Sequence, residues 1–122
     1  MNGDKRPIFY LGSSKKDLQK LPSEVRDVFV QGLYLASLGG TPLGSKALKG
    51  FGGGKQVIEL IEDYRSDTYR AVYTVRLKAA IYVLHVFKKK SNKGIATPKK
   101  DKDMILKRLK AALSYHKEHF KR

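Results

Sequence analysis

The sequence predicts a single α+β domain in which helices pack on one face of a small antiparallel sheet. Three segments rich in Val, Ile, Tyr and Thr follow one another in the second half, joined by links too short for crossover helices, so neighbouring strands should be antiparallel. Two helical segments precede these strands and one amphipathic helix follows them. A chain of 122 residues is close to the commonest domain size, so we expect one domain over residues 1–122.

The amino-terminal part is expected to form one strand and a helical hairpin. Residues 7–12 (PIFYLG) are a compact apolar run that begins at a proline, which suits the first residue of a strand. Ser13 and Ser14 offer N-cap oxygens to a short helix, which Pro22 closes. A second helix is expected from Ser23 to the glycine pair at residues 39–40, because apolar and small residues recur at helical spacing: Val25, Val28, Phe29, Gly32, Leu33 and Ala36.

The second half is expected to contain a glycine-rich loop, three strands and a helix. Residues 41–55 are read as a loop, and the strands are expected over residues 56–62, 68–76 and 80–88. Residues 91–97 are polar, and Thr97 with Pro98 forms an N-cap and first-turn pair. The apolar stripe of the final helix is expected to comprise Leu106, Leu109, Leu113, His116 and Phe120.

The charge balance indicates a polyanionic partner. Lys and Arg number 26 against 11 Asp and Glu, which gives a formal net charge of +15. Nucleic acid is the leading candidate, and no membrane partner is expected because no apolar run is long enough to span a bilayer. The chain has no cysteine and no signal-peptide pattern, so we expect a cytoplasmic protein without disulfides. The three histidines lack metal-ligand spacing, so we expect no metal site.

Several cations are placed where they can converge on a phosphate. Arg70 lies inside an expected strand, on the same face as Val72 by period-two geometry. Residues 88–90 are a lysine triplet at the end of the next strand, and Lys49 and Lys55 lie in the glycine-rich loop. Converging cations without matching carboxylates suit a phosphate or a phosphoryl transition state. The alternatives are a solvated strand face, or a salt bridge from Arg70 to Glu59 or Glu62 on the neighbouring strand.

His85 has two interpretations, since an imidazole with a pKa near 6.5 can act as a general acid or base, or can pack into the core with Phe87. Tyr64, Tyr69 and Tyr82 offer surfaces for stacking bases but also suit ordinary strand packing. From the residues alone, the function is that of a basic domain that binds nucleic acid.

Read together, several motifs in order resemble the phage-derived, HigB-like branch of the RelE/ParE toxin superfamily, the toxin halves of bacterial toxin–antitoxin modules. These are KALKGF (residues 46–51), VIEL (57–60), TYRAVYTV (68–75), VLHVFKKKS (83–91), GIATP (94–98) and the closing amphipathic helix. The resemblance implies a RelE-like, microbial-RNase-type fold with a curved antiparallel sheet and an amino-terminal helical hairpin. It also implies cleavage of messenger RNA in the ribosomal A site, without a cofactor, by attack of the ribose 2′-hydroxyl to give a 2′,3′-cyclic phosphate.

The resemblance also assigns roles to individual residues. Arg70 corresponds to the cation that binds the phosphate and its transition state, and Lys88, Lys89 and Lys90 to a second cationic cluster. The general base is left open between Glu59 and His85. Contacts to RNA or to the ribosome are expected of Lys90 and of the remaining lysines of the motifs and loops: Lys46, Lys49, Lys55, Lys93 and Lys99.

The same resemblance implies a cognate antitoxin, a helix-turn-helix DNA-binding protein whose acidic surface covers the cations. Two other functions stay open at this point. One is non-enzymatic inhibition of DNA gyrase, as in the ParE branch, and the other is RNA binding without catalysis.

Overall fold

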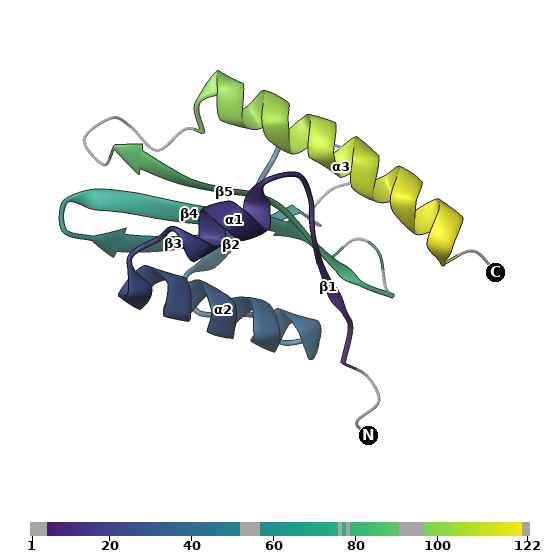
Figure 1. Ribbon diagram of the computed structural model, residues 1–122, viewed down its shortest axis with the longest axis horizontal. Helices are drawn as coiled ribbons and strands as arrows, with labels where there is room; N and C mark the ends of the chain where they lie inside the picture. The colour runs from purple at the N-terminus through teal and green to yellow at the C-terminus, as the bar shows by residue number, and fades with distance from the viewer. Residues whose placement is uncertain (1–4, 52–56, 76, 78, 91–96, 121–122) are drawn as a thin grey trace.

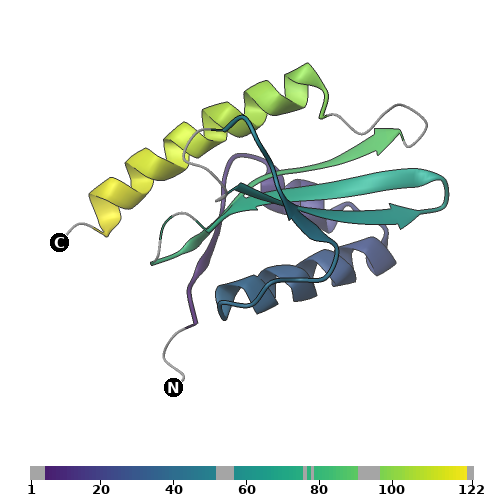
Figure 2. The same cartoon turned by 180° about the vertical axis from the view of Figure 1, so that it is seen from behind.

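The structure is a computed structural model that describes residues 5–51, 57–75, 77, 79–90 and 97–120. It confirms the α+β fold class, with one curved sheet of five strands and three helices (Figures 1 and 2). No helix within these ranges is both long enough and apolar enough to cross a bilayer. The elements in chain order are β1 (Ile8–Tyr10), α1 (Ser14–Gln19), α2 (Ser23–Ser37), β2 (Ser45–Ala47), β3 (Val57–Tyr64), β4 (Asp67–Thr74), β5 (Ile81–Lys90) and α3 (Lys99–His119).

The strands lie in the order β1-β5-β4-β3-β2. Consecutive strands from β2 to β5 are antiparallel, which the short links predicted for β3, β4 and β5, but β1 pairs with β5 in parallel. A short link determines only how two successive strands pair. It could not predict the pairing of β1 with β5, which are far apart in the sequence. The ends of the expected strands at residues 56 and 76 lie outside the described residues.

A short strand was missed in the segment that was read as a loop. β2 runs over Ser45–Ala47 at the sheet edge and pairs with β3, with Lys46 opposite Glu59. Its sequence, Ser-Lys-Ala, contains none of the β-branched aliphatic or aromatic residues on which strand prediction depends. Pairing with a long neighbour therefore forms this strand, rather than its own propensity.

The expectation that all helices cover one face of the sheet is wrong. α1 and α2 cover one face and α3 crosses the other, so the sheet is the middle layer (Figure 1). β4 shows the cause, because its residues from Thr68 to Thr74 are buried on both faces. The core on the α2 side includes Phe29, Leu33, Ala71, Tyr73 and Val83. The core on the α3 side includes Val72, Tyr82, Leu84, Ile105 and Leu109.

The buried stripe of α3 also differs from the expected one. Ile105, Leu109 and Ala112 are buried, whereas Leu106 is 37% exposed. Leu109, Leu113 and Phe120 of the expected stripe belong to the core on the α3 side or pack against it, so the expectation fails at Leu106. A position one residue away on a helix is rotated by about 100°, and Ile105 takes the place of Leu106 against the sheet.

β5 contains an irregularity that decides which of its side chains face α3. Val72 of β4 is opposite His85, but the next residue, Tyr73, is opposite Val83, so Leu84 is an extra residue in β5. Before this β-bulge, Val83 faces α2, and after it Val86 does. The alternation is therefore reversed, and the odd-numbered residues beyond the bulge, Lys89 included, face α3.

Candidate active site

A buried ion pair joins the centres of β3 and β4. Nη1 of Arg70 donates to Oε2 of Glu59 over 2.9 Å, and the two side chains are only 6% and 0% exposed. Glu59 is opposite Val72, which is buried on the α3 side, so the pair lies on that face of the sheet. The salt bridge to Glu59, one of the alternatives that strand geometry allowed, is therefore present, and Arg70 is not a solvated cation.

The ion pair retains unused hydrogen-bonding capacity. Within the described part of the chain, neither Oε1 of Glu59 nor Nε of Arg70 has a hydrogen-bond partner, although both atoms are buried. Native proteins bond nearly all of their buried polar atoms, and the exceptions call for an explanation. Spare donor and acceptor atoms beside a cation suit a site that receives a polar group.

Lys89 stands on the same face, from the neighbouring strand β5. It is opposite Thr68, and only 7% of it is exposed. Burial lowers the pKa of Lys89, as do the positive charges of Arg70 and Lys46, while the carboxylate of Glu59 opposes them. A lysine with a lowered pKa releases its proton more readily, which is the property that a general base needs.

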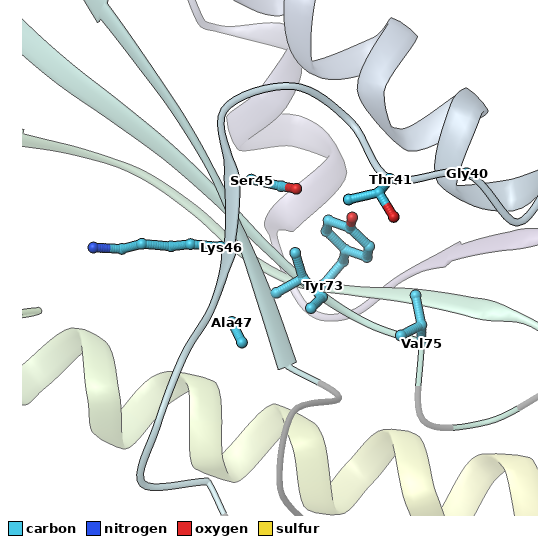
Figure 3. Close-up of a pocket in the computed structure, with 8 residues that line it drawn as sticks. Gly40, Thr41, Ser45, Lys46, Ala47, Tyr73 and Val75 are labelled. Atoms are coloured by element: carbon cyan, nitrogen blue, oxygen red, sulfur yellow. The ribbon is translucent and has the colours of Figure 1, made fainter.

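Lys46 completes the group from the edge strand β2. It lies opposite Glu59, and Figure 3 shows its side chain leaving the strand on the side away from Tyr73. We call Lys46, Glu59, Arg70 and Lys89 the α3-face cluster. It combines three cations with a single carboxylate, so the cluster has an excess of positive charge that suits a phosphate.

His85 lies on the α3 face as well, but its ring is engaged by α3 itself. Nε2 is 2.7 Å from Oδ1 of Asp101, Nδ1 is 3.4 Å from Nη1 of Arg108, and the ring stacks on Phe87 with centroids 4.7 Å apart. Because a guanidinium can only donate, Nδ1 is the acceptor and neutral His85 carries its proton on Nε2, toward Asp101. His85 therefore connects α3 to the bulge of β5.

The structure separates Lys88 from Lys89. Lys88 is opposite Tyr69, which belongs to the core on the α2 side, and its Nζ is 3.7 Å from Oδ2 of Asp67. Alternate residues of a strand point to opposite faces, so adjacent lysines cannot both join the cluster.

The structure describes the side chains of two of the other lysines of the predicted site, and both are exposed. Lys49 is exposed in the loop after β2, and Lys99 is exposed at the start of α3, where its Nζ is 3.0 Å from Oδ2 of Asp103. Lys90 is the last residue of β5. Lys55 and Lys93 lie outside the described residues.

Asp101 and Arg108 were missed by the sequence reasoning. They occupy the same stripe of α3 as Ile105 and Ala112, at spacings of three and four residues. An acidic residue in the first turn of a helix is ordinarily explained by its interaction with the helix dipole. That explanation does not suggest a contact between Asp101 and the sheet. The helical spacing of Asp101 and Arg108 from the buried residues of α3 was the feature of the sequence that could have identified them.

A cavity of about 250 Å³ lies between the sheet and the loop that follows α2 (Figure 3). Tyr73 and Ser45 line it, and burial raises the pKa of Tyr73 to about 12, so this phenol is neutral. Lys46 contributes to the lining but its side chain points away. Across the described ranges, no three His, Asp or Glu side chains are grouped so that they could hold a metal ion.

The fold and the α3-face cluster define a small basic α+β domain with a largely buried cluster of net positive charge. The chain belongs to the phage-derived Gp49-like protein family, whose model matches residues 16–110. This membership confirms the resemblance to the phage-derived, HigB-like branch of the RelE/ParE superfamily. No curated protein sequence shows a significant match to the chain.

Among solved structures, the chain is similar to one from the toxin–antitoxin complex RelBE2 of Mycobacterium tuberculosis. The two chains are 18% identical with a TM-score of 0.45, and the match covers 74% of this chain and 98% of the other.

Proposed function

We propose that this protein is the toxin of a type II toxin–antitoxin module and cleaves messenger RNA on the ribosome without a metal. The observation that carries the proposal is the α3-face cluster, where Arg70 and Lys89 stand buried side by side on neighbouring strands around Glu59. The formal charge of +15 supports a polyanionic target such as the ribosome with its message.

In the proposed reaction, Arg70 and Lys46 bind the phosphate between two nucleotides. The ribose 2′-oxygen forms a bond to phosphorus while the bond from phosphorus to the 5′-oxygen breaks, giving a 2′,3′-cyclic phosphate and a free 5′-hydroxyl. Arg70 stabilises the extra negative charge of the transition state. Lys89 in its neutral form, which its lowered pKa favours, accepts the 2′-hydroxyl proton, and His85 in its protonated imidazolium form is the candidate donor of a proton to the departing oxygen.

Glu59 has a different role in this scheme from the general base considered at first. Its side chain is fully buried, and one of its oxygens is occupied by Arg70. A base must come within hydrogen-bond reach of the proton that it removes. We therefore assign Glu59 to holding and orienting the guanidinium of Arg70, as a positioning residue.

The proposed partners are the ribosome with its message and a cognate antitoxin. The antitoxin follows from the toxin–antitoxin class, and a helix-turn-helix protein is the expected type. Inhibition of DNA gyrase remains the second candidate for the superfamily, but it needs no buried lysine of lowered pKa. The α3-face cluster therefore favours the nuclease.

The test is a cell-free translation reaction programmed with one message, followed by mapping of new 5′ ends by primer extension. The wild-type chain is compared with the double variant Glu59→Met, Arg70→Met, which removes the whole ion pair without leaving a buried charge. Cuts that need both ribosomes and the intact pair are expected. Intact message with full translation, or cuts that persist in the double variant, would overturn the assignment.

A further inference from the structure

One segment of this highly charged chain has no charge at all. Although 30% of all residues are charged, residues 28–45 contain no Asp, Glu, Lys or Arg. This segment comprises most of α2, the loop behind it and the first residue of β2. It lies on the side of the sheet opposite α3, and therefore opposite the α3-face cluster (Figure 2).

The same segment exposes large apolar side chains. Within the part of the chain that the structure describes, all exposed large apolar residues except Leu106 and Tyr115 belong to α2 or its following loop. They are Val28, Val30, Tyr34, Leu35, Leu38 and Leu43, the last being 99% exposed. An exposed apolar patch of this kind marks an interaction site more often than a scattered surface residue does.

The apolar side chains border a groove of about 550 Å³ between α2 and the loop that contains Pro42 and Leu43. Along α2, Val28, Gln31 and Leu35 line the groove, and Leu38 continues the series at spacings of three and four residues. Such a spacing presents one continuous seam along a helix. A groove beside a seam is the shape that receives the apolar face of another helix.

Charge decides which occupant fits. The groove offers no cation to a nucleic-acid phosphate, and a second copy of the chain would bring another charge of +15 to a protein that already carries +15. At the carboxyl end of α2, Lys5 Nζ lies 4.9 Å from the centre of the Tyr34 ring, and Arg6 Nη2 donates to the carbonyl oxygen of Ala36 over 3.3 Å. An apolar surface with cations at one end is complementary to an amphipathic helix that carries acidic residues beside its apolar face.

We propose that this α2 groove is the docking site for one amphipathic, acid-flanked helix of the antitoxin. The proposal rests on the proposed function for the nature of the partner, but its location comes from the surface of α2. A helix bound there occupies the face opposite the α3-face cluster, so this contact by itself leaves Arg70 and Lys89 uncovered.

The probe is the protein encoded by the reading frame that adjoins the gene of this chain, purified and titrated by calorimetry. We compare the wild-type chain with the variant Leu35→Glu, Leu38→Glu, and use Leu106→Glu on α3 as the matched control, since all three side chains are already exposed. The groove variant is expected to weaken the Kd by about 100-fold or more, while the control leaves it unchanged. Message cleavage by both variants should match the wild type.

The outcomes separate the two proposals. Unchanged binding by the groove variant, or absence of binding by the wild-type chain, overturns the docking site. A wild-type dimer in sedimentation that the groove variant abolishes overturns it as well, because a second copy would then occupy the groove. Binding that depends on Leu35 and Leu38, together with intact message, would retain the docking site and reject the nuclease.

Discussion

The guanidinium of Arg70 bonds to the carboxylate of Glu59 over 2.9 Å, and the two side chains are only 6% and 0% exposed. Each charge is stable in this position only because the other is present. A residue expected to contribute only to chemistry therefore also contributes to folding. Loss of activity in a simple Arg70 variant would not by itself show a role in catalysis.

Arg70→Ala should destabilise the protein by about 3–5 kcal/mol, because the carboxylate of Glu59 would remain buried without a partner. The double variant Glu59→Met, Arg70→Met should recover most of this loss, since buried ion pairs can be replaced by apolar side chains of similar volume. Unfolding in urea measures both changes. An Arg70→Ala protein as stable as the wild type would mean that Glu59 can reach water, contrary to its complete burial.

Lys89 and Lys88 provide a matched pair of adjacent lysines on opposite faces of β5. Lys89→Ala should lower the rate of message cleavage by about 10²–10⁴-fold, the usual contribution of a positioned general base. Lys88→Ala removes the same charge from the other face and should change the rate by no more than about twofold, as for an exposed ion pair. Primer extension of time courses gives both rates. Equal losses would show that only net charge matters.

Because the pKa of Lys89 is lowered, the free energy of unfolding should change with pH in the alkaline range. Because this pKa is lower in the folded chain than the 10.5 of an ordinary lysine, the unfolded chain binds this proton more tightly. The contribution of Lys89 to the free energy of unfolding must then rise as the pH increases from its folded pKa to 10.5.

Comparison with Lys89→Met isolates this contribution from the other lysines, which titrate in both proteins. The free energy of unfolding of the wild type, minus that of Lys89→Met, should increase over the same alkaline window. Urea unfolding at a series of pH values measures the difference. A difference that stays constant with pH would show that the pKa of Lys89 is not lowered.

Gly12 should not tolerate a side chain, because its φ is +54° and an added Cβ would lie 2.7 Å from the guanidinium of Arg108. That guanidinium bonds to the carbonyl oxygen of Leu84 over 3.0 Å and to Oγ of Ser13 over 3.2 Å. Gly12→Ala should therefore both strain the backbone and displace Arg108.

Gly39→Ala is the control for Gly12→Ala, since Gly39 also has a positive φ, +92°, but an added Cβ would meet no atom within 4 Å. Gly39→Ala should cost about 1–3 kcal/mol from backbone strain alone. Gly12→Ala should cost more than this, by an amount that thermal unfolding measures. Equal costs would show that Arg108 moves aside freely.

Local sequence patterns predicted the parts of this fold that depend on neighbouring residues. The three long strands followed from their Val, Ile and Tyr content, and period two placed Arg70 on the face of Val72. Features that depend on distant contacts were not predictable in this way. The strand β2, the parallel pairing of β1 and the position of α3 on the second face all depend on contacts with other elements, which for β1 lie far along the chain.

The candidate site was predictable to a similar extent. Arg70, Glu59 and Lys89 were named from their residue types and from the family resemblance. Which lysine of the triplet faces α3 depends on the β-bulge at Leu84. Leucine is an ordinary residue in a strand, so its type did not indicate a bulge. Asp101 was not identified, because its partner His85 lies in another element.

The extra residue at Leu84 gives a reason for a run of lysines at the end of β5. One residue more or less before Lys88 exchanges the faces toward which all later side chains of the strand point. If β5 continued from Val83 without the bulge, Leu84 would be opposite Val72 and Lys88 opposite Thr68, so a lysine would face the α3 side in either arrangement. Repetition of one residue type thus makes the charge of the site insensitive to a small insertion or deletion upstream, which a single lysine at this end could not do.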